Sequence, residues 1–195
     1  MLTLNPDVTE LDRWVRNIIE VWNLASAEQL TRGRNWYQSA RELADVMSEG
    51  DVKAGAGVIA ALSPMSAWAL NVRMAEQAFA NGFPAGHPGD ALRKAAMIMA
   101  GADPEDVLPM SAKTGNFYRC ILDPEDEEAV TVDRHAHDIV AGARWGSRDR
   151  GLSSKKRYAK IALAYRMAAA YLTERPSVVQ ATTWVVWTSM EAGTP

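Results

Sequence analysis

The stretches LPMSAKTGNF, residues 108–117, and VTVDRHAHDIVAGARWG, residues 130–146, decide which fold this chain is expected to adopt. In the first stretch, a proline-containing turn leads to Lys113, where the pattern of a helix begins. In the second, a run of β-branched residues leads to Asp133, which stands at the threshold of another helix. That run stands alone in the sequence, so we interpret it as an extended lead-in rather than a strand of a sheet.

Helical periodicity dominates the rest of the chain. Apolar residues predict a first helix that starts near Thr9, and Ser26 with Gln29 matches a capping box that opens a second. The Ser63-Pro64 pair should interrupt a third helix, because the residue before a proline resists the α region. Together these patterns predict an all-α protein of about nine short helices without a sheet. The later helices are expected over residues 52–62, 65–80, 90–100, 113–122, 153–173 and 176–190, with a brief turn over 103–108.

The composition bounds the class of protein. With 195 residues and 48% hydrophobic composition, the chain is expected to form a single domain, residues 1–195, that buries a sizeable core. Cys120 is the only cysteine, which excludes a disulfide framework and any four-cysteine metal cluster. A free thiol, together with the lack of a secretory signal or a long apolar run, predicts a cytoplasmic protein with no membrane partner.

The charge is unevenly distributed. A net charge of −3 counts against a nucleic-acid binder, since such proteins usually carry a basic face. However, acids gather in residues 123–128, whereas residues 144–157 hold one acid, Asp149, against Arg144, Arg148, Arg150, Lys155, Lys156 and Arg157. This local basic segment keeps a nucleic-acid partner open.

A glycine motif at residues 55–60, GAGVIA, matches the G-x-G-x-x-[GA] string of dinucleotide-binding folds. That motif works only after a strand and at the N-terminus of a helix, where the phosphates bind. Here the preceding residues are polar and turn-like, so we interpret the glycines as small residues that let helices pack closely.

A histidine pair, His135 and His137, lies between Asp133 and Asp138 and suggests a metal site. In an extended chain the two histidines would share a side that the two aspartates do not both join. On a helix the two histidines, which are two positions apart, would point about 200° away from each other. Neither conformation therefore brings all four side chains together. Structural hydrogen bonds are therefore the stronger interpretation of the histidines, and a metal would need ligands from elsewhere in the chain.

The two opening stretches resemble the helix–hairpin–helix DNA glycosylases of the endonuclease III superfamily. In that family an L-P-G-V-G-x-K-T-A hairpin precedes a V-D-T-H-V-x-R-[VI] element by a similar interval. The hairpin pattern is matched by Pro109, Lys113 and Thr114, and the second element by Val132, Asp133 and His135. The string VIAALSP, residues 58–64, looks like the end of an upstream family helix, so the resemblance covers roughly residues 55–146.

A closer likeness is to small glycosylase-like proteins of bacteriophages, some of which are associated with hypermodified thymine in phage DNA. They are similar in VTVDRHA, residues 130–136, and in a late element that corresponds here to QATTWVVW, residues 180–187. The tryptophans of this late element, Trp184 and Trp187, lie three apart on one helical face, so core packing is the competing interpretation.

The resemblance implies a two-lobed helical domain in which residues of about 55–130 form the helix–hairpin–helix lobe and the terminal segments form the other. It implies an enzyme that acts on a base in DNA, or on a modified base of the hypermodified thymine type, in the host cytoplasm if phage-encoded. We expect no metal and no other cofactor. Asp133 would stabilise charge or act as a base, and Lys113 would be the nucleophile. Contacts to substrate or DNA are expected from Pro109, Ser111, Thr114, Asn116, Arg134, His135, Gln180 and Trp184.

The chain also departs from the family. Met110, Ser111 and Ala112 replace most of the hairpin glycines, Arg134 stands where a small polar residue is usual, and the C-terminal four-cysteine cluster is missing. These differences favour a specialised substrate over ordinary repair of duplex DNA. Two alternatives stay open, a catalytically inactive scaffold that binds nucleic acid or a host protein, and a metal-dependent hydrolase that uses His135 and His137.

Overall fold

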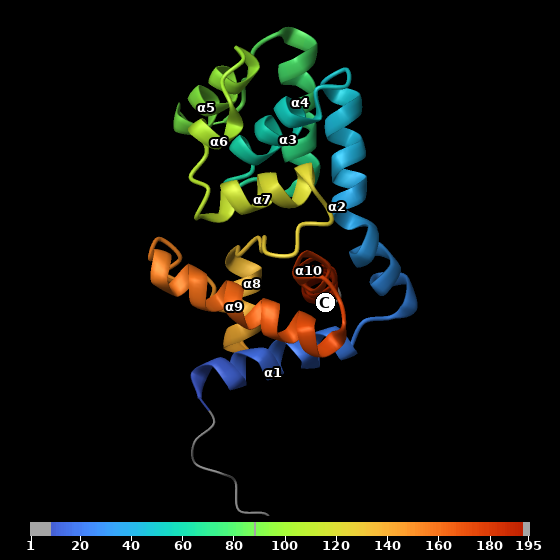
Figure 1. Ribbon diagram of the computed structural model, residues 1–195. Helices are drawn as coiled ribbons and strands as arrows, with labels where there is room; N and C mark the ends of the chain where they lie inside the picture. Colours follow the sequence, from blue (N-terminus) through green and yellow to red (C-terminus); the bar gives the residue numbers. More distant parts are fainter. Residues whose placement is uncertain (1–8, 88, 193–195) are drawn as a thin grey trace, which may run out of the picture. The chain divides into compact units, whose positions relative to one another are not determined.

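The computed structural model describes residues 9–87 and 89–192, and within these ranges it contains ten helices and no strand (Figure 1). The prediction of an all-α protein is therefore confirmed. None of these helices is long and apolar enough to cross a membrane.

The chain divides into two compact units. Unit 1 combines residues 1–35 with residues 132–195, and unit 2 is formed by residues 36–131, so the boundary falls within α2 (Ala27–Met47). The segment expected to be the helix–hairpin–helix lobe lies in unit 2, and its glycosylase-type arrangement stays a prediction. Unit 1 holds α1 (Glu10–Asn23), α8 (Arg134–Ala141), α9 (Lys155–Leu172) and α10 (Pro176–Ala192). Unit 2 holds α3 (Val52–Ala61), α4 (Trp68–Asn81), α5 (Gly89–Met99), α6 (Pro104–Val107) and α7 (Lys113–Leu122).

In unit 1, each of the four helices α1, α8, α9 and α10 contacts the other three (Figure 1). The short helix α8 buries most of its length, including Ile139 and Val140. Its last turn is tied to α1 because the Asn17 amide donates a 2.7 Å hydrogen bond to the Val140 carbonyl. Gly142 ends the helix in the left-handed conformation, with φ of 68°, which glycine adopts without steric cost.

In unit 2, α3 is the central helix and contacts α4, α5, α6 and α7. Every residue over 55–61 is buried. A Cβ added to Gly55 would lie 2.3 Å from the Ala44 carbonyl oxygen of α2, and one added to Gly57 would lie 2.8 Å from Pro104. Both glycines sit inside the helix rather than before it, which confirms that they permit close helix packing.

The proline interruption after α3 is confirmed, but the next helix begins later than expected. Met65 has a positive φ of 57°, so it lies in a turn, and α4 starts only at Trp68. The β-branched residues 130–132 form no strand and lead directly into the N-cap of α8, as expected.

The close approach at Gly55 predicts the effect of a single methyl group. Gly55→Ala should lower the free energy of unfolding by about 1–3 kcal/mol, because the helix backbones of α2 and α3 must move apart. The matched control is Gly89→Ala, at an exposed helical position of the same unit where an added Cβ meets no atom within 4 Å. Urea denaturation of both variants measures the difference. Equal stability of the two variants would contradict this account of the glycine motif.

Candidate functional site

Asp133 is the N-cap of α8. Its Oδ1 accepts hydrogen bonds from the backbone N–H groups of His135, at 2.9 Å, and Ala136, at 2.8 Å. The side chain is half-buried, and no hydrogen bond to its second oxygen, Oδ2, occurs in the described part of the chain. The aspartate thus has one oxygen held by the helix start and one oxygen available to another group.

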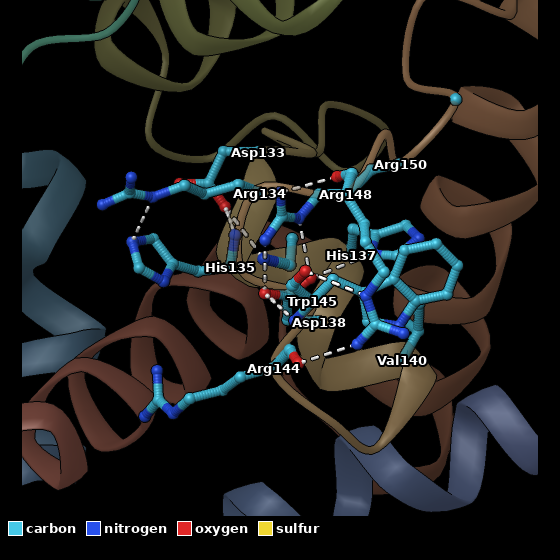
Figure 2. Close-up of polar contacts among 12 residues, drawn as sticks. Asp133, Arg134, His135, His137, Asp138, Val140, Arg144, Trp145, Arg148 and Arg150 are labelled. Atoms are coloured by element: carbon cyan, nitrogen blue, oxygen red, sulfur yellow. Dashed lines mark hydrogen bonds and ion pairs between the residues drawn. The ribbon is translucent and has the colours of Figure 1, made fainter.

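Three of the expected binding residues line up beside Asp133 in unit 1. The exposed Arg134 donates from Nε to Nε2 of His135 at 3.1 Å (Figure 2). The His135 ring meets the half-buried Trp184 of α10 edge to face, with ring centroids 6.4 Å apart. Gln180, also on α10, is only 5% exposed, so it is part of the core of this unit.

The hairpin candidates all belong to unit 2. Lys113 is the first residue of α7, and its Nζ donates to the Ser63 carbonyl at 3.4 Å. The Asn116 amide donates to the Met110 and Ala112 carbonyls at 3.3 and 3.0 Å, so this buried side chain holds the turn together rather than facing a ligand.

The turn before α7 packs closely against Gly115 in the first turn of that helix. A Cβ added to Gly115 would lie 2.3 Å from the Cα atom of Met110. Pro109 and Ser111 are exposed and Thr114 is half-buried around the start of the helix. The two catalytic candidates are thus supplied by different units, Lys113 by unit 2 and Asp133 by unit 1.

A second carboxylate of α8, Asp138, is the centre of a hydrogen-bond network that the sequence did not reveal (Figure 2). Arg150 binds it with both prongs, Nε to Oδ1 and Nη2 to Oδ2, each at 2.8 Å. The backbone N–H of Trp145 donates to Oδ2 at 3.2 Å, and Nδ1 of His137 donates to Oδ1 at 3.0 Å. Burial alone would raise the pKa of Asp138, but the hydrogen bonds from these donors outweigh it and hold the pKa below its usual value.

His137 is completely buried, and both of its ring nitrogens are engaged. While Nδ1 donates to Asp138, Nε2 lies 3.1 Å from Nη2 of Arg157 and accepts a hydrogen bond from it, which requires a neutral ring. Burial lowers the pKa of His137, in agreement with this hydrogen-bond pattern.

These contacts leave His137 unable to coordinate a metal through either nitrogen. Within residues 9–87 and 89–192, no three histidine, cysteine, aspartate or glutamate side chains are grouped to hold a metal ion. The thiol of Cys120 is buried as well, and burial raises its pKa to about 12, so it is not a nucleophile at neutral pH.

Sequence reasoning missed Asp138 as an anchor, together with its partners Arg150 and Trp145. The basic segment over residues 144–157 was the available signal. The structure divides that segment, because Arg150 and Arg157 turn inward to Asp138 and His137, whereas Arg144, Arg148, Lys155 and Lys156 are exposed.

Comparison with known proteins places the chain in one family. Residues 2–191 match the model described as "Family of unknown function (DUF7178)". The chain belongs to the DUF7178 family. No curated protein and no solved structure matches it.

The buried His137 of this DUF7178 protein predicts a pH dependence of stability. Because its pKa is lower in the folded chain than its ordinary value of 6.5, the unfolded chain binds the proton first, and stability falls as the pH drops below that value. Urea denaturation between about pH 7.5 and about pH 5.5 should show this loss in the wild type and a flatter profile in His137→Gln.

His87→Gln is the matched control, since it removes a half-buried histidine of unit 2 that lies outside the network of His137, Asp138 and Arg157. The loss of stability that His137 causes should remain in this variant. Protonation of Asp138, which would weaken its ion pair with Arg150, occurs only below the usual pH range for aspartate, because the pKa of Asp138 is lowered. It therefore does not contribute between about pH 7.5 and about pH 5.5. Identical slopes in the two histidine variants would refute the role given to His137.

Proposed function

We propose that this protein is a DNA glycosylase-like enzyme that acts on a base in DNA, with Asp133 as its central catalytic residue. The observation that carries the proposal is the Asp133 carboxylate, which has one oxygen fixed by two backbone N–H groups and the other without a hydrogen-bond partner in the described chain. The N-terminus of α8 favours negative charge at this place.

The chemistry of N-glycosidic cleavage suits such a group. As the bond between base and sugar breaks, positive charge builds on the sugar, and a carboxylate that is already oriented stabilises that charge without reorganising. Oδ1 fixes the orientation of Asp133 and leaves Oδ2 to face the sugar or the attacking nucleophile. A bond forms between the nucleophile and the sugar carbon as the bond to the base breaks. The base departs with the bonding electrons and takes up a proton, and Asp133 receives the proton that the nucleophile loses.

The neighbours of Asp133 suit a nucleotide turned out of the helix stack. Enzymes of this kind hold such a base by stacking and by hydrogen bonds to its edge. The half-buried Trp184 supplies an aromatic surface beside His135, and the exposed guanidinium of Arg134 can reach a phosphate. We assign these three residues to substrate binding.

The hairpin of unit 2 is assigned to the DNA backbone. The N-cap of α7, Ala112, provides no side-chain cap, so first-turn N–H groups can donate to a phosphate flanked by Ser111 and Thr114. Lys113 is assigned the nucleophile's role. That role requires the amine to be neutral, so that its lone pair attacks the sugar carbon. The resemblance to phage proteins makes a modified thymine the first substrate class to test.

Replacing the central carboxylate tests the proposal. Asp133→Asn should keep the fold, because asparagine caps a helix as well as aspartate does, but should slow base release by roughly a hundredfold or more. Base release is measured by mass spectrometry on single- and double-stranded oligonucleotides that contain thymine, uracil or 5-substituted uracils.

On a cleaved substrate, borohydride should trap a covalent adduct with the wild type and none with Lys113→Ala.

Asp51→Asn is the matched control, since Asp51 caps α3 in the same way, accepting from the Ala54 N–H, but has no candidate site around it. It should release base at the wild-type rate. Equal release by the wild type and Asp133→Asn on every cleaved substrate would overturn the proposal. DNA binding without any release, unchanged in Asp133→Asn, would make the protein a binding scaffold instead.

A further inference from the structure

Unit 1 contains a small cavity that the proposed function does not use. It has a volume of about 170 Å³ and lies against α1, the C-terminal half of α8 and the start of α9; His137, Val140 and Trp145 of its wall are labelled in Figure 2. Asp133 is not part of its lining. The complete lining is Glu10, Arg13, Trp14, His137, Val140, Ala141, Trp145 and Arg157.

The charges of the lining favour an anion. Arg13 and Arg157 both face the cavity, and the only carboxylate of the lining, Glu10, is paired with Lys160 outside it. His137 is neutral, because its Nε2 accepts from Arg157. Glu10 also attracts Arg13 and Arg157, but its single negative charge is shared with Lys160, so positive charge stays in excess around the cavity. A phosphate group carries a charge of about −1.5 to −2 at neutral pH.

Arg157 has a hydrogen-bond donor that the protein itself leaves unused. Its Nη2 is committed to His137, and its Cζ lies 5.8 Å from the centroid of the Trp14 ring. Its Nε is buried and has no hydrogen-bond partner in the described part of the chain. Because Nε is shielded, a ligand in the cavity would meet this guanidinium through Nη1, which also has no hydrogen-bond partner in the described residues. An anion there gains charge-assisted hydrogen bonds.

The size of the cavity limits the ligand. A cavity of about 150 Å³ holds one benzene ring, and pockets for drug-sized molecules reach about 300 Å³ or more. The space between Trp14 and Trp145 therefore takes one phosphate group with little else, and not a whole nucleotide.

We propose that the cavity lined by Arg13, Trp14, His137, Trp145 and Arg157 is a binding site for a single phosphate group. The guanidinium groups of Arg13 and Arg157 hold the phosphate oxygens, and the two tryptophans form the walls. The site does not depend on the chemistry assigned to Asp133, so phosphate binding can be tested separately from base release. The phosphate comes either from solution or from the 5′ end of a nucleic-acid strand.

Isothermal titration calorimetry with inorganic phosphate, at constant ionic strength set by chloride, tests the site in the full chain. The wild type should bind one phosphate, and Arg13→Gln and Arg157→Lys should each weaken binding by roughly tenfold or more. Arg13 is exposed, so its replacement leaves the fold intact, which circular dichroism checks for each variant. Lys156→Gln, an exposed cation on the first turn of α9 outside the lining, should bind phosphate as the wild type does.

Two further arms identify the source of the phosphate. Thymidine 5′-monophosphate and a 5′-phosphorylated dinucleotide are compared with their unphosphorylated forms. Tighter binding of the phosphorylated dinucleotide than of inorganic phosphate, lost in Arg13→Gln, supports a strand end, whereas equal binding supports a free phosphate. No saturable phosphate binding by the wild type, equal binding of acetate, or an equal loss in Lys156→Gln would overturn the proposal.

Discussion

The ion pair between Asp138 and Arg150 is the constraint on which the site-bearing part of unit 1 depends. Asp138 is 5% exposed and accepts hydrogen bonds from Arg150, from the Trp145 N–H and from His137. These bonds join α8 to the segment that follows it, and His137 passes the connection on to Arg157 of α9. Removing one partner of a buried ion pair typically costs about 3–5 kcal/mol, because the other charge is left buried and unpaired.

The two carboxylates of α8 differ because their environments differ. Asp138 is surrounded by donors that use both of its oxygens, so it is committed to structure. Asp133, at the start of the same helix, gives one oxygen to the backbone and keeps the other available. Environment is what assigns roles to neighbouring acids in enzymes. The same division applies to the basic segment, in which Arg150 turns inward to the ion pair and Arg148 remains exposed.

Local signals in the sequence predicted most of the helices, but they could not predict contacts between residues that are distant in the sequence. The Ser26–Gln29 capping box forms with both of its hydrogen bonds, because a cap depends only on residues three apart. The late start of α4 was missed, since the positive φ of Met65 has no signal in an apolar side chain. Of the candidate site, the position of Asp133 at a helix start was predicted, whereas its contrast with Asp138 was not, because Arg150 reaches Asp138 across a loop.

The free energies of unfolding of Asp133→Asn and Asp138→Asn, measured by urea denaturation at neutral pH, test this division of roles most directly. Asn at position 133 still caps α8, so the first variant should differ from the wild type by less than about 1 kcal/mol. The second removes the charge that balances the inward-facing Arg150, and should lose roughly 3 kcal/mol or more. Similar losses in both variants, or a greater loss in Asp133→Asn, would contradict the account.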